Sequence, residues 1–206
     1  MKVPDDGVSF DLSSISTQEI KKSGKYHGTR IIFNALIYTA RVSMHFDIGF
    51  GDAVHPEPEI QEFPQILETF QPPSIFVYSP YSMVAEKFEA IVSLGILNSR
   101  VKDYFDIWLL SEKFDFDFIL LKQSIMNTFQ RRGNRIPNEI PTGLSPMFYG
   151  SREKQLLWNR FMKRVNPALM PENLQTAAQR IEALLLPLIK PENAVPSLWK
   201  AGIGWK

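Results

Sequence analysis

The sequence predicts an α+β protein in which β-strands come first and α-helices follow. Residues 30–50 show the branched and alternating apolar pattern of strands, and from Ser79 to Leu186 the apolar residues recur at the spacing of helices. The composition is that of a folded globular protein, because 44% of the 206 residues are hydrophobic and 22% are charged. This length suits one domain, or one domain with a small appendage.

The strands are predicted in the N-terminal third of the chain. Residues 30–37 are rich in branched side chains, and residues 41–50 alternate strictly, so that one face collects the apolar residues Val42, Met44, Phe46, Ile48 and Phe50. We expect these segments to form an antiparallel pair that turns near residues 38–40. The proline-rich residues 52–73 are predicted to be mostly loop, with a short strand or helical turn near Ile66. Residues 74–78 are predicted to form a short strand.

The first helix has clear start and stop signals. Ser79 suits the N-cap, Pro80 suits the first helical position, and Gly95 suits the end of a helix that runs from Pro80 to Leu94. A second helix is expected from about residue 99, a third ending at Gly133, and two more at about 151–165 and 171–186. The expected division is a sheet region (residues 1–78), a helical domain (79–190) and a tail (191–206).

Composition narrows the function classes. The formal net charge is +1, which argues neither for nor against nucleic acid. The sequence contains no cysteine, which excludes disulfides and thiolate metal sites and is compatible with a reducing cytoplasm. The N-terminal residues lack the apolar core of a signal peptide, and no apolar run approaches the length of a transmembrane helix. We therefore expect a cytoplasmic protein without a membrane partner.

Three charged residues lie on unexpected faces of the first two helices. At about 100° per residue, Asp103 and Asp106 lie opposite the core face, yet the large apolar Leu110 continues their side of the helix. Lys87 lies in the apolar stripe of the preceding helix. One interpretation is a solvated face and a lysine that snorkels to water. The other is a shared polar cleft, in which Lys87 approaches Asp103 or Asp106 on the side of the sheet where Asp47 emerges.

Other candidate residues also have two interpretations. Asp47 occupies the middle of the alternating strand, where it is either simply exposed or a ligand for Mg²⁺, which prefers oxygen donors. A basic group at the end of the third helix either complements the helix dipole or contacts RNA or nucleotide phosphate, and it consists of Arg131, Arg132 and Arg135. Asp115 and Asp117 are predicted to form a loop and a helix N-cap. The tryptophans and Tyr26 are predicted to pack rather than to stack on bases.

Several segments together resemble the abortive-infection nucleotidyltransferase toxin family of the AbiEii/AbiGii type. The resemblance extends over residues 5–190, and its most specific part is the pair of motifs "AEK" and "SRxKDxxD". In chain order the segments are "DDGVSFD", "YHGTRI", "HFDIGFGD", "VYSPYSMVAEKFEAI", "LNSRVKDYFDIWLL" and "TFQRRGNRIP".

The resemblance implies a polymerase-β-type nucleotidyltransferase fold, here a partial antiparallel sheet followed by a C-terminal helical bundle. It implies a toxin of a phage-defence system that is paired with a cognate antitoxin, uses NTP and Mg²⁺, and transfers a nucleotide to an acceptor such as tRNA. By motif position, Lys87, Arg100 and Lys102 would contact nucleotide phosphates. Lys87 and either Asp103 or Asp106 would belong to the catalytic motifs, and Asp47 would match the third carboxylate.

Two family motifs are missing from the sequence. A Gly-Gly or Gly-Ser turn and an Asp-x-Asp strand precede the "DDGVSFD" segment in the family, and here that segment already begins at residue 5. The expectation is therefore a C-terminal part of such an enzyme, as a fragment, a truncated gene product or a short form, with weak or no Mg²⁺ binding. Two function classes stay open: a nucleotidyltransferase-type toxin whose activity is residual or completed by another chain, and a non-catalytic module that binds an antitoxin, nucleotide or RNA.

Overall fold

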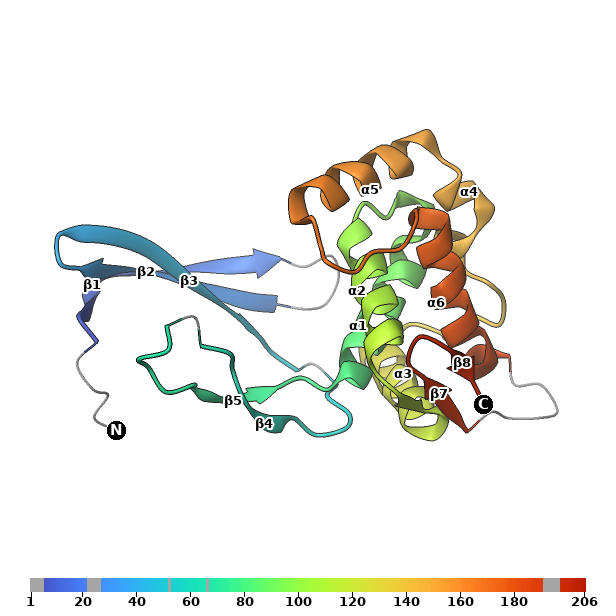
Figure 1. Ribbon diagram of the computed structural model, residues 1–206, viewed down its shortest axis with the longest axis horizontal. Helices are drawn as coiled ribbons and strands as arrows, with labels where there is room; N and C mark the ends of the chain where they lie inside the picture. The colour runs from blue at the N-terminus through green and yellow to red at the C-terminus, as the bar shows by residue number, and fades with distance from the viewer. Residues whose placement is uncertain (1–5, 22–26, 52, 66, 191–196) are drawn as a thin grey trace. The chain divides into compact units, whose positions relative to one another are not determined.

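The computed structural model describes residues 6–21, 27–51, 53–65, 67–190 and 197–206. The chain is α+β, as predicted, with N-terminal antiparallel strands followed by six α-helices among the described residues (Figure 1). It forms two compact units, Met1–Asp52 and Ala53–Lys206, which we call the N-terminal unit and the C-terminal unit and describe separately.

The N-terminal unit is an antiparallel sheet with the strand order β1-β2-β3. Its strands are β1 (Val8–Lys21), β2 (His27–Ile37) and β3 (Ala40–Gly49). The predicted pair is β2 and β3, and Tyr38 adopts a φ of 54° in the turn between them. The sequence did not predict β1, whose register with β2 shifts between Asp11 and Ser16. That irregularity breaks the alternation by which a strand is identified.

One face of this sheet is apolar, as the alternation in β3 predicted. Phe46 packs against Phe33 with ring centroids 5.3 Å apart, and Phe33 packs against Phe10 at 5.8 Å. These contacts do not make a buried layer, because Phe46 is 58% exposed and only Ala35 is buried among residues 6–20 and 28–51. The pattern therefore predicted the face correctly but not a core beneath it.

The C-terminal unit begins with a hairpin of β4 (Glu59–Glu62) and β5 (Ser74–Val77). The strand β5 was predicted, whereas β4 falls in the region that was expected to be mostly loop. The helices that follow are α1 (Pro80–Leu94), α2 (Val101–Lys113), α3 (Phe118–Arg132), α4 (Pro146–Tyr149), α5 (Arg152–Val165) and α6 (Leu174–Ile189). Short 3-10 turns, η1 (Gly95–Leu97) and η2 (Thr142–Leu144), lie between them.

The helix ends follow the local signals. Ser79 is the N-cap of α1, and its Oγ accepts a hydrogen bond from the Ser82 backbone N–H at 3.1 Å. Asp117 caps α3 in the same way through the Leu120 N–H at 2.9 Å, as predicted. Gly133 ends α3 at a φ of 69°, a conformation that glycine adopts without steric cost.

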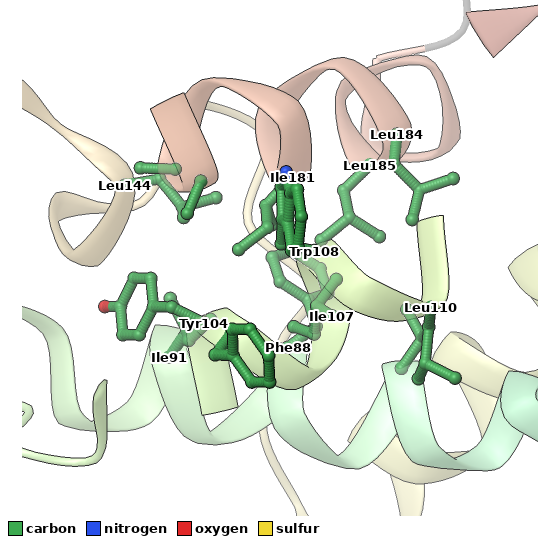
Figure 2. Packing of buried hydrophobic residues seen from close by; sticks show 14 of the residues in the cluster. Phe88, Ile91, Tyr104, Ile107, Trp108, Leu110, Leu144, Ile181, Leu184 and Leu185 are labelled. Atoms are coloured by element: carbon green, nitrogen blue, oxygen red, sulfur yellow. The ribbon is translucent and has the colours of Figure 1, made fainter. Parts of the chain in front are cut away.

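The core of the C-terminal unit is built around α2. Figure 2 shows side chains of α2 between those of α1 on one side and α6 on the other. The fully buried residues include Phe88 from α1, Tyr104 and Ile107 from α2, and Ile181 from α6. Large apolar side chains packed on both sides of one helix give this unit the continuous core that a stable domain requires.

Residues 197–206 also pack into this unit. The strand β7 (Leu198–Lys200) pairs with β6 (Phe116–Asp117) and with β8 (Gly204–Trp205). Trp199 is 1% exposed and donates its indole N–H to the Ser111 carbonyl at 2.9 Å. The prediction that tryptophans pack is confirmed for Trp199 and for Trp158, while Tyr26 lies outside the described residues. No helix in the described part of the chain is long and apolar enough to cross a bilayer.

Candidate functional site

Five charged side chains of α1, of α2 and of the N-cap of α2 form one group, which we call the α1–α2 charge cluster. Its members are Lys87, Arg100, Lys102, Asp103 and Asp106. The Lys87 Nζ lies 3.0 Å from the Asp103 Oδ1 and 2.7 Å from the Asp106 Oδ2. The prediction that Lys87 approaches at least one of the two aspartates is therefore confirmed, and it contacts both.

Helix packing holds Lys87, Asp103 and Asp106, which we call the inner triad, in place. Val84, Phe88 and Ile91 bury one side of α1 in the core, which brings the Lys87 side chain against α2. The side chains of Lys87, Asp103 and Asp106 are 16%, 4% and 14% exposed. Charged side chains that are this deeply buried need a partner of opposite charge, and the ion pairs compensate for the cost of removing these charges from water.

The two remaining cations lie at the rim of the cluster. The Arg100 Nε is 2.8 Å from the Asp103 Oδ2, and the Lys102 Nζ is 2.5 Å from the Asp106 Oδ2. The Nε–Oδ2 contact is an ion pair without a hydrogen bond, and the Arg100 Nη2 donates a long hydrogen bond to the Asp103 Oδ1 at 3.5 Å. The Arg100 and Lys102 side chains are 58% and 66% exposed, so they present charge to solvent while the inner triad does not.

The protonation state of Lys87 follows from its surroundings. Burial alone would lower the pKa of the amine, but the hydrogen bond to Asp106 and the charges of Asp103 and Asp106 outweigh it. The pKa of Lys87 is therefore raised above its ordinary value of 10.5, and the amine stays charged at neutral pH. A charged ammonium with two bound carboxylates is suited to hold negative groups and not to act as a nucleophile or base.

Uncharged residues beneath the cluster fix the start of α2. Asn98 is fully buried, and its Oδ1 accepts a hydrogen bond from the Arg100 backbone N–H at 2.8 Å. Tyr104 donates to the Gly143 carbonyl at 2.8 Å and stacks on Phe148 with centroids 4.9 Å apart. Burial, together with the Asp103 charge, raises the pKa of Tyr104.

Gly143 is required for this contact, because a Cβ there would come within 3.0 Å of the Tyr104 hydroxyl and closer still to Ile91. The sequence motif that contains Asn98 and Tyr104 did not predict that these two residues fix the start of α2. The role of Tyr104 depends on the distant loop and helix at residues 142–149.

Asp47 is paired with an arginine of the neighbouring strand. Arg30, directly opposite on β2, holds both carboxylate oxygens, with Nε to Oδ1 at 2.7 Å and Nη2 to Oδ2 at 2.8 Å. This hydrogen bond raises the pKa of Arg30. The expectation that Asp47 emerges on the same side as the α1–α2 charge cluster stays a prediction, because Asp47 belongs to the N-terminal unit and each unit is described by itself.

The described residues do not fit a magnesium site. Among them, no group of three or more histidines, cysteines, aspartates and glutamates is close enough to share a metal ion. The carboxylates of Asp103 and Asp106 are already occupied by lysine and arginine, and that of Asp47 by Arg30. Mg²⁺ is usually bound by one or two carboxylates together with waters and substrate phosphates, and here it would first have to displace the cations that hold these carboxylates.

The basic group at the end of α3 divides into two parts. Arg132 pairs with Glu89, whose side chain is 4% exposed, and Asn134 donates to the same carboxylate at 2.5 Å. These contacts tie the end of α3 to α1. Arg131 and Arg135 are exposed, and their predicted contact with RNA or phosphate stays a prediction.

The order of strands and helices, together with a lysine joined to two aspartates across α1 and α2, is the arrangement expected for a nucleotidyltransferase-type toxin. A family model described as nucleotidyl transferase AbiEii toxin, type IV TA system, matches residues 2–180. The chain belongs to the AbiEii nucleotidyltransferase toxin family of type IV toxin–antitoxin systems. No curated protein and no solved structure gave a significant match. Membership in this family implies an antitoxin as partner and NTP as substrate.

Proposed function

We propose that the α1–α2 charge cluster binds the phosphates of a nucleoside triphosphate. The observation that carries this proposal is the excess of cations at one place. Three cations (Lys87, Arg100 and Lys102) meet two carboxylates (Asp103 and Asp106), and the two outer cations are mostly exposed. Phosphate binding requires positive charge and N–H donors, and an exposed arginine supplies both in a planar fork.

The cations have different parts in this proposal. An ammonium group has three donors, and Asp103 and Asp106 engage Lys87 at 3.0 and 2.7 Å. Lys87 is therefore chiefly a positioning residue, which holds both aspartates and through them the rim. Arg100 and Lys102 make the direct phosphate contacts, since their side chains reach solvent. The fully buried Asn98 fixes the backbone from which Arg100 projects.

Under this proposal the α1–α2 charge cluster takes part in nucleotide transfer from NTP to an acceptor, and tRNA is the first candidate acceptor. The described residues do not form a magnesium site, and phosphoryl chemistry depends strongly on metal ions that neutralise charge. We therefore expect this chain alone to bind NTP but to transfer little or none of it. The second candidate, a non-catalytic module that binds nucleotide, RNA or an antitoxin, is favoured by the pairing of both aspartates with cations.

Binding is tested by titrating a fluorescent NTP against the protein and an Arg100→Gln variant. The change removes a charge-assisted hydrogen bond worth about 1.5 kcal/mol, so the affinity should fall about tenfold. The matched control is Lys113→Gln, which removes an exposed cation at the other end of α2 and should leave affinity unchanged. No binding by the native protein, or an equal loss in the control, would contradict the proposal.

Transfer is tested with each of the four labelled NTPs, bulk tRNA and Mg²⁺ or Mn²⁺. Binding without incorporation supports the expectation for this chain. Robust incorporation that disappears in both Arg100→Gln and Lys87→Ala would show a complete catalytic site and would refute the claim of weak transfer.

A further inference from the structure

A surface cavity of about 230 Å³ lies between α4, α5 and α6, within the C-terminal unit. Tyr149 provides its partly exposed aromatic surface, whereas Trp158 and Leu174 are 3% and 1% exposed and form its floor. The other lining side chains are all carboxamides, namely Gln155, Asn159, Asn173 and Gln175. An aromatic surface combined with neutral donors and acceptors suits a flat, polar, uncharged ring.

The carboxamides retain unused hydrogen-bonding groups. Gln155 donates to the Tyr149 carbonyl at 3.2 Å, and the Asn173 Oδ1 accepts from the Thr176 N–H at 2.9 Å to cap α6. The Asn159 and Gln175 side chains make no hydrogen bond with other described residues of the protein. A primary amide offers an acceptor and two donors side by side, which is the pattern that pairs with the edge of a nucleobase.

The helix α5 that forms one wall is strongly basic. It contains five cations (Arg152, Lys154, Arg160, Lys163 and Arg164) and one acid, Glu153, and the acid lies 3.4 Å from the nearly buried Lys154. The other four cations are exposed and form no ion pair with described residues. The whole chain carries a net charge of only +1, so this surplus is local to α5.

Two of the four exposed cations, Arg152 and Lys163, share one side of α5 with the carboxamides. At about 100° per residue, Arg152, Asn159 and Lys163 fall on the same stripe, with Gln155 beside them. Positive charge therefore lies at both ends of the carboxamide row. A basic stripe that flanks a base-sized cavity matches the two requirements of single-stranded nucleic acids, phosphate neutralisation and base stacking or edge contact.

We propose that α5 binds a single-stranded nucleic acid, with its phosphates on Arg152 and Lys163 and one unpaired base in the cavity between α4, α5 and α6. The cavity is smaller than the range of about 300–1,000 Å³ typical of ligand pockets, so it suits one base and not a whole nucleotide. An acidic peptide would use the cations but would not need the aromatic and amide lining. This site shares no residue with the α1–α2 charge cluster and goes beyond its proposed function.

The proposal is tested by fluorescence anisotropy with labelled homo-oligonucleotides of each base, as RNA and as DNA, over a range of salt concentrations. Lys163→Gln should weaken binding to every sequence and reduce the slope of log K against log salt by about 0.7. Asn159→Leu should retain the native salt slope but reduce the spread of affinities among the four bases. Both side chains are exposed, so these variants should keep the native circular dichroism spectrum.

Lys113→Gln on α2 is the matched control for charge, and Arg100→Gln separates this site from the NTP site. Both should bind oligonucleotides like the native protein, even if NTP binding fails altogether. Equal weakening by Lys163→Gln and Lys113→Gln would overturn the proposal, as would equal native affinity for all four bases. Displacement by poly-glutamate at the same charge concentration would show a general polyanion surface and would also refute it. A preference for RNA over DNA, or the reverse, identifies the type of strand.

Discussion

The two units of this chain show equally regular apolar patterns, yet only one of them has a core. In the C-terminal unit the predicted helical stripes are buried, and Phe88, Tyr104 and Ile107 are fully inaccessible. In the N-terminal unit the alternation in β3 is just as clear, but Phe46 stays 58% exposed. Apolar periodicity thus determines the element and its face, whereas burial also requires a second layer of structure against that face.

The largest expected effect is a difference in stability between the two units when each is produced as a separate fragment. A fragment of residues 53–206 should keep its helical circular dichroism and unfold cooperatively on heating, because its core is contained within it. A fragment of residues 1–52 should show no cooperative transition, because a single-layer sheet buries too little apolar surface to compensate for its conformational entropy. Cooperative unfolding of the shorter fragment as a monomer would show that the sheet is stable without a second layer.

Elements that depend on local signals could be predicted from the sequence, whereas elements that depend on distant pairing could not. The bounds of α1 follow from Ser79, Pro80 and Gly95, which act within one or two turns of the helix. The strand pair β2–β3 follows from its alternation and short turn. In contrast, β6 pairs with β7 across more than eighty residues, so Phe116 and Trp199 become neighbours only in the folded chain. Local signals do not contain such a pairing, and β1 was missed because its bulge interrupts the period.

The candidate site could be predicted where charged residues occupy positions that the helical pattern assigns to apolar ones. Lys87 in an apolar stripe and Asp103 beside large apolar residues indicated charges that need partners, and the structure joins them. The support from Tyr104 was not predictable, because its acceptor Gly143 lies 39 residues away in a loop. The Arg30 partner of Asp47 depends on strand register, which pairs the two residues directly across β2 and β3.

A second prediction compares an inner and an outer cation of the α1–α2 charge cluster. Lys87→Met should lower the free energy of unfolding by about 3 kcal/mol, since it leaves nearly buried carboxylates without their central partner. Lys102→Met is the matched control, because Lys102 binds the same Asp106 oxygen but is 66% exposed. Its cost should be below about 0.5 kcal/mol. Chemical denaturation measures both, and equal effects would show that burial does not determine the strength of these pairs.

The contribution of Lys87 should also depend on pH in a defined direction. Its pKa is raised in the folded state, so the stabilisation is fully present below 10.5 and is lost as the pH rises through the folded-state value. The difference between the native protein and Lys87→Met should thus be constant near neutral pH and shrink in strongly alkaline solution. A difference that grew with pH above 10.5 would mean that the pKa is lowered in the folded protein.

The smallest expected effect tests a single cap in the well-packed unit. Ser79→Ala removes the Oγ that accepts the Ser82 N–H at 3.1 Å, and should lower the free energy of unfolding by about 1 kcal/mol. In a protein of this length that corresponds to a fall in Tm of about 2–4 °C. Ser151→Ala is the matched control, because Ser151 occupies the N-cap of α5 without a capping hydrogen bond. Its loss should cost less than about 0.5 kcal/mol. If calorimetry gave the two variants the same Tm, the α1 cap would not contribute to stability, and the start of α1 would instead depend on the packing of its buried face against α2.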